Sequence, residues 1–450
     1  MPRVLFEQFV EEGLGCASYL VGDEQTGDAV VIDPGYAVEQ YLDAAERKGV
    51  RISRVLETHT HADHVSGHGR LALEHGLPVC IHPEAGPDYP FEPLEDGAQV
   101  DAGQVCLRVI HTPGHRPEHC CFAVADLSRS DEPWLVLTGD SLLVGDAARP
   151  DLAVEAREGA EGLFHSLRRL LELPDGVELF PGHVAGSLCG AGMSSKASST
   201  IGFERRFNAK LAYAEAADFI AESIAATSTP RPPNMQRIVE LNRGPFLGSQ
   251  PPLEEVHATG GATVLDVRSA DEFARGHVPG AINIPVGGSS FSTKAGFVLD
   301  AEEPVAVYAA SDEQARRAVR GLYAVGLFAV SGYLTGVPAD EALEPLTLDD
   351  LERMLGNGSV ELIDVREKDE RDQGYIPESL HIPYRRIRAC ADELRGNGTV
   401  VTICESGSRA STAASILVAA GVDARPVLGE GVSAWRARGG QCVEFRRCGS

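Results

Sequence analysis

Positive charge is scarce in this chain. Its 450 residues include 40 Lys and Arg against 66 Asp and Glu, which gives a formal net charge of -26. A protein this acidic repels nucleic acid phosphates and anionic membrane surfaces, so we expect neither as a partner. An anionic substrate would need a local basic site, because the chain as a whole does not attract it.

Long apolar runs are also missing. The N-terminus, MPRVLFEQFV, lacks the basic segment and the apolar core of a signal peptide. The apolar run from Ala413 to Val422 is among the longest, and it has about half of the ~20 residues that span a bilayer. The ten cysteines include no CxxC pair. We therefore expect a cytoplasmic protein with reduced thiols.

The length of the chain is too great for one compact core and suggests about three domains. The first part alternates short β-rich runs with helical runs, and the Pro-rich segment STPRPPN (228–234) ends it. We place the domains at 1–244, 245–342 and 343–450.

Six segments of the first domain read as strands that end in loops, namely AVVIDPG (29–35), RISRVLETH (51–59), PVCIHP (78–83), VCLRVIHTPGH (105–115), PWLVLTGD (133–140) and VELFPGH (177–183). Four of them end on His or Asp. Such positions often carry catalytic groups, because loops vary while the sheet fixes where they start. Helices are expected over 37–48, 66–76, 159–172 and 203–226.

An internal repeat fills the rest of the chain. VLDVRSADEFARGHVPGAINIP (264–285) aligns without a gap to LIDVREKDERDQGYIPESLHIP (362–383). Each copy continues through a second strand, VAVYA (305–309) or VVTIC (400–404), into a loop and a helix. The sequence therefore predicts two homologous α/β domains with parallel sheets.

The stretch THTHADH (58–64) concentrates groups that bind metal ions. On an extended segment His59 and His61 would face one side, and Asp63 and His64 follow on the turn. Imidazole and carboxylate ligands suit Zn(II), Fe(II) or Mn(II) rather than a thiolate site. Three later residues at strand ends complete a set of seven candidate ligands: His115, Asp140 and His183.

This HxHxDH pattern resembles the metallo-β-lactamase superfamily, whose fold is an αββα sandwich. The segments TGDSLLVGDAARPDL (138–152) and PGHVAGSLCGAGMSSKASSTIGFERRFN (181–208) are more closely similar to bacterial persulfide dioxygenases. The whole chain resembles fusions of such a dioxygenase to rhodanese-like sulfurtransferase domains. Glyoxalase II typically has a third adjacent histidine, where this chain has Thr60.

The resemblance implies one Fe(II) per chain, held by His59, His115 and Asp140. Two imidazoles and one carboxylate would leave three positions for water, substrate sulfur and dioxygen. The other four candidates would then support the site or hold a second ion, and zinc is the alternative metal: His61, Asp63, His64 and His183.

Two further residues near these motifs remain open. Cys189 is either a packing cysteine or a sulfur-handling or regulatory thiol, since the fusions carry a cysteine at this position. Arg149, in the segment ARPDL, either orients its loop or meets an anionic substrate.

A second motif, CESGSRAS (404–411), lies between a predicted strand and a predicted helix. There, loop amides and the helix N-terminus favour a thiolate at Cys404. Arg409 adds a cation that can bind sulfonate or thiosulfate oxygens. With LGEGVSAWRARGG (428–440), this arrangement resembles the rhodanese family, although Tyr375 and Glu378 replace the usual His and Gly. In the first copy Ala309 and Ala310 stand where the nucleophile should be, so we expect that copy to be inactive.

From the residues and the resemblance together we expect oxidation of a low-molecular-weight thiol persulfide to sulfite by dioxygen. Cys404 would move sulfane sulfur, forming thiosulfate or running in reverse. The alternatives are a dinuclear thioester hydrolase of glyoxalase II type and a docking role for the repeats without catalysis. The identity of the thiol and the assembly of chains into a homo-oligomer stay open.

Overall fold

The computed structural model describes residues 4–11, 13–150, 154–184, 194, 196–225, 233–288, 290–336, 340–358, 360–396 and 398–444. The chain divides into two compact units. The first is Met1–Gln250 with Tyr323–Gly326, and the second is Pro251–Leu322 with Leu327–Ser450. The domain boundaries near 245 and 343 stay predictions.

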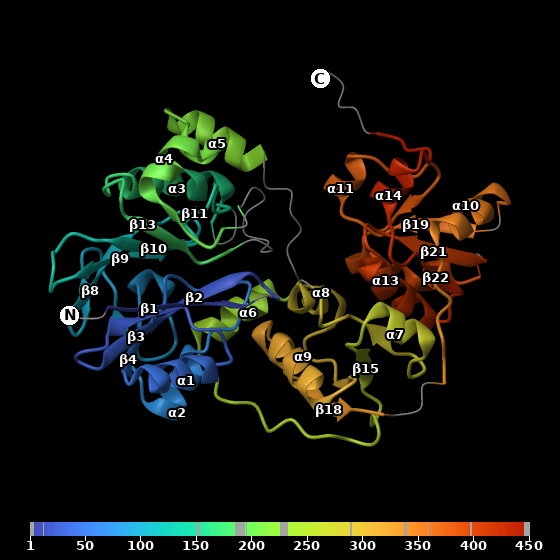
Figure 1. Cartoon of the computed structure of the whole chain (residues 1–450), viewed down its shortest axis with the longest axis horizontal. Helices are drawn as coiled ribbons and strands as arrows, with labels where there is room; N and C mark the ends of the chain where they lie inside the picture. The colour runs from blue at the N-terminus through green and yellow to red at the C-terminus, as the bar shows by residue number, and fades with distance from the viewer. Residues whose placement is uncertain are drawn as a thin grey trace. The chain divides into compact units, whose positions relative to one another are not determined.

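Two six-stranded sheets form the centre of the first unit (Figure 1). In spatial order, one contains β1 (Val4–Glu11), β2 (Cys16–Asp23), β3 (Asp28–Ile32), β4 (Arg51–Leu56), β5 (Val79–Ile81) and β6 (Glu92–Pro93). The other contains β14 (Ser199–Thr200), β13 (Glu178–Pro181), β10 (Leu135–Gly139), β9 (Cys120–Asp126), β8 (Val105–His111) and β7 (Gln99–Ala102). The short strands β11 (Leu142–Leu143) and β12 (Asp146–Ala147) pair with each other.

Apolar side chains from both sheets pack into one core between them. Tyr19 and Ile32 of the first sheet share this cluster with Phe122 and Leu137 of the second. Burying a large apolar side chain in this way stabilises the fold by about 1.5–3 kcal/mol.

Helices cover the two outer faces, as Figure 1 shows. The helices α1 (Glu39–Lys48) and α2 (His68–His75) pack on the first sheet through a second cluster that includes Tyr41 and Leu71. The helices α3 (Ala156–Leu170) and α5 (Ala216–Ala225) pack on the second sheet through Leu163 and Phe219. The predicted αββα sandwich is therefore confirmed.

The long helix predicted over 203–226 is wrong. The structure has α4 (Ile201–Phe207), the 3-10 turn η2 (Ala209–Leu211) and then α5. Asn208 separates them: its amide donates to the carbonyl of Asp146 at 2.9 Å, and its side-chain oxygen accepts from the backbone of Lys210. These bonds hold Asn208 in extended backbone and override the helical tendency of the segment.

A single helix, α6 (Met235–Arg243), follows the Pro-rich segment and belongs to the first unit. Its Asn242 is buried, and its side-chain amide donates to the carbonyls of His61 and His64 at 2.9 and 2.8 Å. Its side-chain oxygen accepts from the backbone N–H of Ser66. The helix therefore holds the loop that carries the THTHADH motif.

The second unit contains two four-stranded parallel sheets with the same topology, which confirms the internal repeat. In chain order the first copy has β15 (Thr263–Asp266), α7 (Ala270–Arg275), β16 (Ile282–Asn283), α8 (Phe291–Val298), β17 (Val305–Tyr308), α9 (Asp312–Ala324) and β18 (Val330–Leu334). The second copy has α10 (Leu348–Gly356), β19 (Val360–Asp364), α11 (Lys368–Asp372), β20 (Leu380–His381), α12 (Ile387–Cys390), β21 (Thr399–Ile403), α13 (Ser408–Ala419), β22 (Ala424–Pro426) and α14 (Val432–Ala437). Short 3-10 turns lie at η1 (Pro83–Ala85), η3 (Tyr384–Arg386) and η4 (Ala391–Leu394).

The Asp-Val-Arg triplet makes the same contacts in both copies. Arg268 binds the carboxylate of Asp266 with contacts as short as 2.5 Å, and Arg366 binds that of Asp364 at 2.8 and 2.9 Å. Each guanidinium also donates, at 2.8 Å, to a backbone carbonyl near the end of the following helix. The triplet thus joins a strand end to the helix after it, which is a structural role.

No helix within the ranges that the structure describes combines the length and the apolar character needed to cross a membrane. The cytoplasmic location stays a prediction.

Glu378 carries a backbone strain that its counterpart in the first copy avoids. Its φ is 62°, in the left-handed region, and Gly280 has a φ of 75° at the equivalent position. A non-glycine residue there costs about 1–2 kcal/mol. The Glu378 side chain is exposed.

We predict that Glu378→Gly raises the free energy of unfolding of the last domain by about 1 kcal/mol, since glycine adopts a positive φ freely. The chain has two tryptophans, and Trp435 lies in the core of this domain. Its fluorescence in a Trp134→Phe background reports unfolding in denaturant. The matched control is Glu378→Ala, which should change stability little because the strain stays. Equal effects of both variants would contradict this account.

Candidate metal centre and thiol loop

Three of the candidate ligands meet at one end of the sandwich. His59 follows β4, His115 follows β8, and Asp140 follows β10, so both sheets contribute. All three side chains are buried. The Nε2 atoms of His59 and His115 lie 4.0 and 3.4 Å from Oδ2 of Asp140. Donors about 2.1 Å from a common ion have separations of this size, so these three side chains fit a metal ion.

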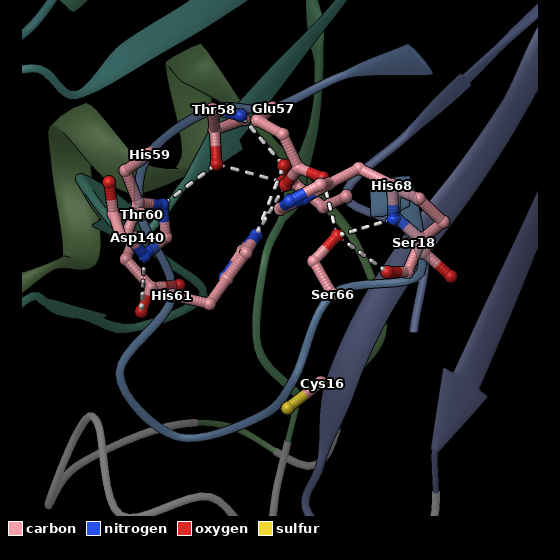
Figure 2. Close-up of polar contacts among 12 residues, drawn as sticks. Cys16, Ser18, Glu57, Thr58, His59, Thr60, His61, Ser66, His68 and Asp140 are labelled. Atoms are coloured by element: carbon pink, nitrogen blue, oxygen red, sulfur yellow. Dashed lines mark hydrogen bonds and ion pairs between the residues drawn. The ribbon is translucent and has the colours of Figure 1, made fainter. Parts of the chain in front are cut away.

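Hydrogen bonds orient the two imidazoles for that purpose. The hydroxyl of Thr58 donates to the carboxylate of Asp33 at 2.8 Å. Its oxygen therefore accepts from Nδ1–H of His59 at 2.8 Å, a contact that Figure 2 shows. Nδ1–H of His115 donates to the carbonyl of Arg149 at 3.2 Å. These partners assign the tautomer in which both Nε2 lone pairs face Asp140.

The charges at the centre suit a cation. Burial, and then the neighbouring His61, lowers the pKa of His59 well below its usual value, and burial lowers that of His115. Burial alone would raise the pKa of Asp140, but His183 lowers it well below its usual value. The site therefore offers two neutral imidazoles and one carboxylate at neutral pH, with little competition from protons.

His183 and Asp63 form a chain behind Asp140. His183 Nδ1 lies 2.6 Å from Oδ1 of Asp140, and its Nε2 lies 2.7 Å from Oδ2 of Asp63. The other oxygen of Asp63 contacts Nδ1 of His64 at 3.2 Å. Three of the four supporting candidates are thus engaged with one another.

His61 turns to a different cluster. Its Nε2 lies 3.3 Å from Asp33 and 3.2 Å from Glu57, and Figure 2 shows the ring directed toward Glu57. Burial would lower the pKa of His61, but these two carboxylates raise it well above its usual value. The rings of His59 and His61 still lie close together, with centroids 4.3 Å apart, although the segment after Leu56 bends instead of extending.

Cys16 lies beside the centre, although its sequence context contains no motif. Its Sγ is 3.1 Å from Oδ2 of Asp63 and 3.4 Å from Nε2 of His183. Burial, and then the charge of Asp63, raises the pKa of this thiol well above its usual value. Cys16 therefore donates as a thiol and is not a nucleophile in this arrangement.

His119 also supports the candidate metal centre, and the motif spacing did not indicate it. It is fully buried, and its Nε2 accepts from the backbone N–H of Asp140 at 2.9 Å. Its Nδ1 contacts the hydroxyl of Thr112 at 2.8 Å. Together with Asn242, which binds the carbonyls of His61 and His64, it fixes the backbone that presents the candidate ligands.

The sequence left the roles of Arg149 and Cys189 open, and the described residues include only Arg149. Arg149 is half-buried, and its backbone carbonyl orients His115 as described above. Cys189 lies outside the described residues.

The thiol loop of the last copy joins β21 to α13. Cys404 is buried at the end of the strand, and its Sγ accepts from the backbone N–H of Gly407 at 3.2 Å. Gly407 has a φ of 90°, and a Cβ there would lie 2.9 Å from the backbone of Leu428. Glycine is required at this turn both by its conformation and by the close approach.

Arg409 has a partner that the sequence did not indicate. Its two terminal nitrogens lie 2.5 and 2.6 Å from the carboxylate oxygens of Glu370 on α11. Arg409 was expected to bind the oxygens of a substrate anion. In the structure Glu370 already occupies its bidentate face, so most of its charge is balanced.

The loop of the first copy is built differently. Ala309 follows β17 where Cys404 follows β21, because Tyr308 pairs with Asp266 as Ile403 pairs with Asp364. The backbone N–H of the next residue, Ala310, donates to the side chain of Gln314 at 2.7 Å. This copy thus has neither a thiol nor a free amide at that position of the loop.

Comparison with known families agrees with this architecture. Residues 12–183 match the model of the metallo-beta-lactamase superfamily, and residues 250–339 and 347–438 match that of the rhodanese-like domain. A crystal structure of a metallo-beta-lactamase from Staphylococcus aureus subsp. aureus COL has a TM-score of 0.68 at 29% identity, over 74% of this chain and 99% of that chain.

Curated relatives match the first domain. The mitochondrial persulfide dioxygenase of Bos taurus is 32% identical over 184 residues, which cover 40% of this chain and 68% of that protein. A probable polyketide biosynthesis zinc-dependent hydrolase of Bacillus velezensis is 27% identical over 192 residues, covering 41% of this chain and 80% of that protein. The chain therefore belongs to the metallo-beta-lactamase superfamily through its first domain, and two rhodanese-like domains follow that domain.

Proposed function

We propose that the first domain oxidises a low-molecular-weight thiol persulfide with dioxygen at a single Fe(II) held by His59, His115 and Asp140. One persulfide, one dioxygen and one water give one thiol, one sulfite and two protons. The observation that carries this proposal is the convergence of two Nε2 atoms and one carboxylate oxygen from His59, His115 and Asp140.

A three-ligand site suits this reaction better than hydrolysis. When bound, Fe(II) supplies a redox-active ion with open positions for sulfur and dioxygen. Hydrolysis of a thioester needs one activated water and is typical of two-metal sites in this superfamily. In this chain Asp63 and His183 contact each other, and His183 contacts Asp140, so a second ion there would have to replace these contacts. The persulfide dioxygenase of Bos taurus supports the same choice.

We further propose that the last copy transfers sulfane sulfur through Cys404. The thiolate of Cys404 attacks the outer sulfur of thiosulfate, the S–S bond to the sulfonate breaks, and sulfite leaves with the electron pair. In reverse, sulfite produced by the first domain takes the sulfur from the Cys404 persulfide and leaves as thiosulfate. Tethering the two sites raises the effective concentration of the shared intermediate.

Loss of one ligand tests the oxidation. In His115→Ala, iron content should fall from about one per chain to near zero, and oxygen uptake on glutathione persulfide should fall to background. Thiosulfate:cyanide sulfurtransferase activity should persist, since Cys404 lies in the other unit. The control is His75→Ala, which removes an exposed imidazole. Brisk thioester hydrolysis by a zinc-loaded wild type, without oxygen uptake on persulfide, would favour the hydrolase.

Removal of the Cys404 thiol tests whether persulfide oxidation is coupled to sulfur transfer. Cys404→Ser should keep oxygen uptake on persulfide but change the sulfur product from thiosulfate to sulfite, because no persulfide can form on serine. Chromatography of derivatised products measures both anions in parallel. Thiosulfate formation at the wild-type rate would place sulfur transfer elsewhere, with Cys189 as the first alternative, and would leave the repeats a docking role.

A further inference from the structure

The first rhodanese-like copy packs directly against the helix that follows Cys404. The backbone N–H of Asn283, at the end of β16, donates to the hydroxyl of Ser415 at 2.9 Å. The hydroxyl of Ser411 donates to the side-chain oxygen of Asn283, also at 2.9 Å. All three residues are fully buried. Buried polar groups paired in this way fix the position of α13 against the first copy.

A second contact holds α8 of the first copy near the same site. Arg388 of the last copy donates to both carboxylate oxygens of Glu303 at 2.7 and 2.6 Å. It also donates to the carbonyl of Val298, the last residue of α8, at 2.9 Å. Phe297 on α8 meets the ring of Tyr384 edge-on, with centroids 6.2 Å apart.

Lys294 extends from α8 to the thiol loop. Its Nζ donates to the hydroxyl of Ser408, four residues after Cys404, at 3.1 Å. The side chain is half-buried. Burial, and then the charge of Arg409, lowers the pKa of Lys294, while Cys404 raises it, so the ammonium lies within electrostatic reach of both groups.

The two cations near Cys404, Arg409 and Lys294, differ in whether a carboxylate balances their charge. Arg409 is bound on both terminal nitrogens by Glu370. Among the described residues no carboxylate pairs with Lys294, whose hydrogen-bond partner is a neutral hydroxyl. A partly buried ammonium without a counter-charge attracts an anion strongly, because the surrounding dielectric is low.

We propose that Lys294 binds the anionic end of the sulfur donor or acceptor at Cys404, so that the two rhodanese-like copies share one sulfur-transfer site. The sulfonate of thiosulfate, or free sulfite, is an anion of the right chemistry. The copy without a thiol then contributes to catalysis, because it supplies a cation for the anion. Arg409 does not supply that cation, since Glu370 neutralises it. This inference rests on the proposed sulfur transfer at Cys404.

Lys294 contributes to the binding of the anion and not to the making or breaking of bonds. Its removal should therefore raise the KM for thiosulfate and leave kcat almost unchanged. In Lys294→Ala, the KM for thiosulfate in the thiosulfate:cyanide assay should rise about 10- to 100-fold, the size expected for one lost charge-assisted contact. The kcat should stay within about threefold of the wild type. Lys294→Arg should restore most of the affinity, because it keeps the charge at the same place on α8.

The matched control is Lys368→Ala, which removes an exposed ammonium of the last copy paired with Asp372. It should leave KM unchanged. Trp435 fluorescence and thermal unfolding of the full chain verify that every variant is folded. An unchanged KM in Lys294→Ala, with wild-type activity present, would overturn the inference.

Calorimetric binding of thiosulfate to the Cys404→Ser chain, with and without Lys294→Ala, separates this inference from the proposed function. No sulfur transfer can occur in that background. Binding weakened about tenfold or more by Lys294→Ala supports the shared anion site even if the wild type shows no turnover, in which case only the proposed sulfur transfer fails. Equal binding in the two proteins overturns the shared site whatever the turnover.

Discussion

The carboxylate of Asp140 is the group on which the proposed metal centre depends. One of its oxygens faces the Nε2 atoms of His59 and His115, and the other is held 2.6 Å from His183. An ionised carboxylate is costly to bury alone, and the contact with His183, which lowers the pKa of Asp140, offsets that cost. The chain from Asp140 through His183 to Asp63 therefore keeps one oxygen turned toward the ion site.

We propose that the same electrostatics favours one ion over two. A second ion near the first would need His61, Asp63, His64 or His183 as ligands. His61 is held between Asp33 and Glu57, which favour its charged form, and the other three contact one another. The seven candidates thus separate into the trio of His59, His115 and Asp140 and two neighbouring groups, one around His61 and one around Asp63. Asp33, which lies beside His61, also orients His59 through Thr58. The same carboxylate therefore supports a ligand of the proposed site.

Much of this organisation could be predicted from sequence, because spacing fixes it. The Asp-Val-Arg triplets predicted the repeat, and the motif with the strand ends predicted seven candidate ligands. The family resemblance singled out His59, His115 and Asp140 among them. Tertiary partners could not be predicted in this way. The pairing of β1 with β2, the break at Asn208, the pairing of Glu370 with Arg409 and the contact of Lys294 with Ser408 join segments whose separation in the chain carries no periodic signal. His119 and Asn242 likewise act through the backbone of other residues, which no motif records.

The central claim is that this sandwich holds one ion and not two. Mössbauer spectroscopy of protein loaded anaerobically with excess iron-57 tests it most directly. The account predicts a single high-spin Fe(II) species at about one ion per chain, with the nitrogen and oxygen ligation of two imidazoles and one carboxylate. Two magnetically coupled irons per chain would contradict it, because the second iron would need ligands beyond His59, His115 and Asp140.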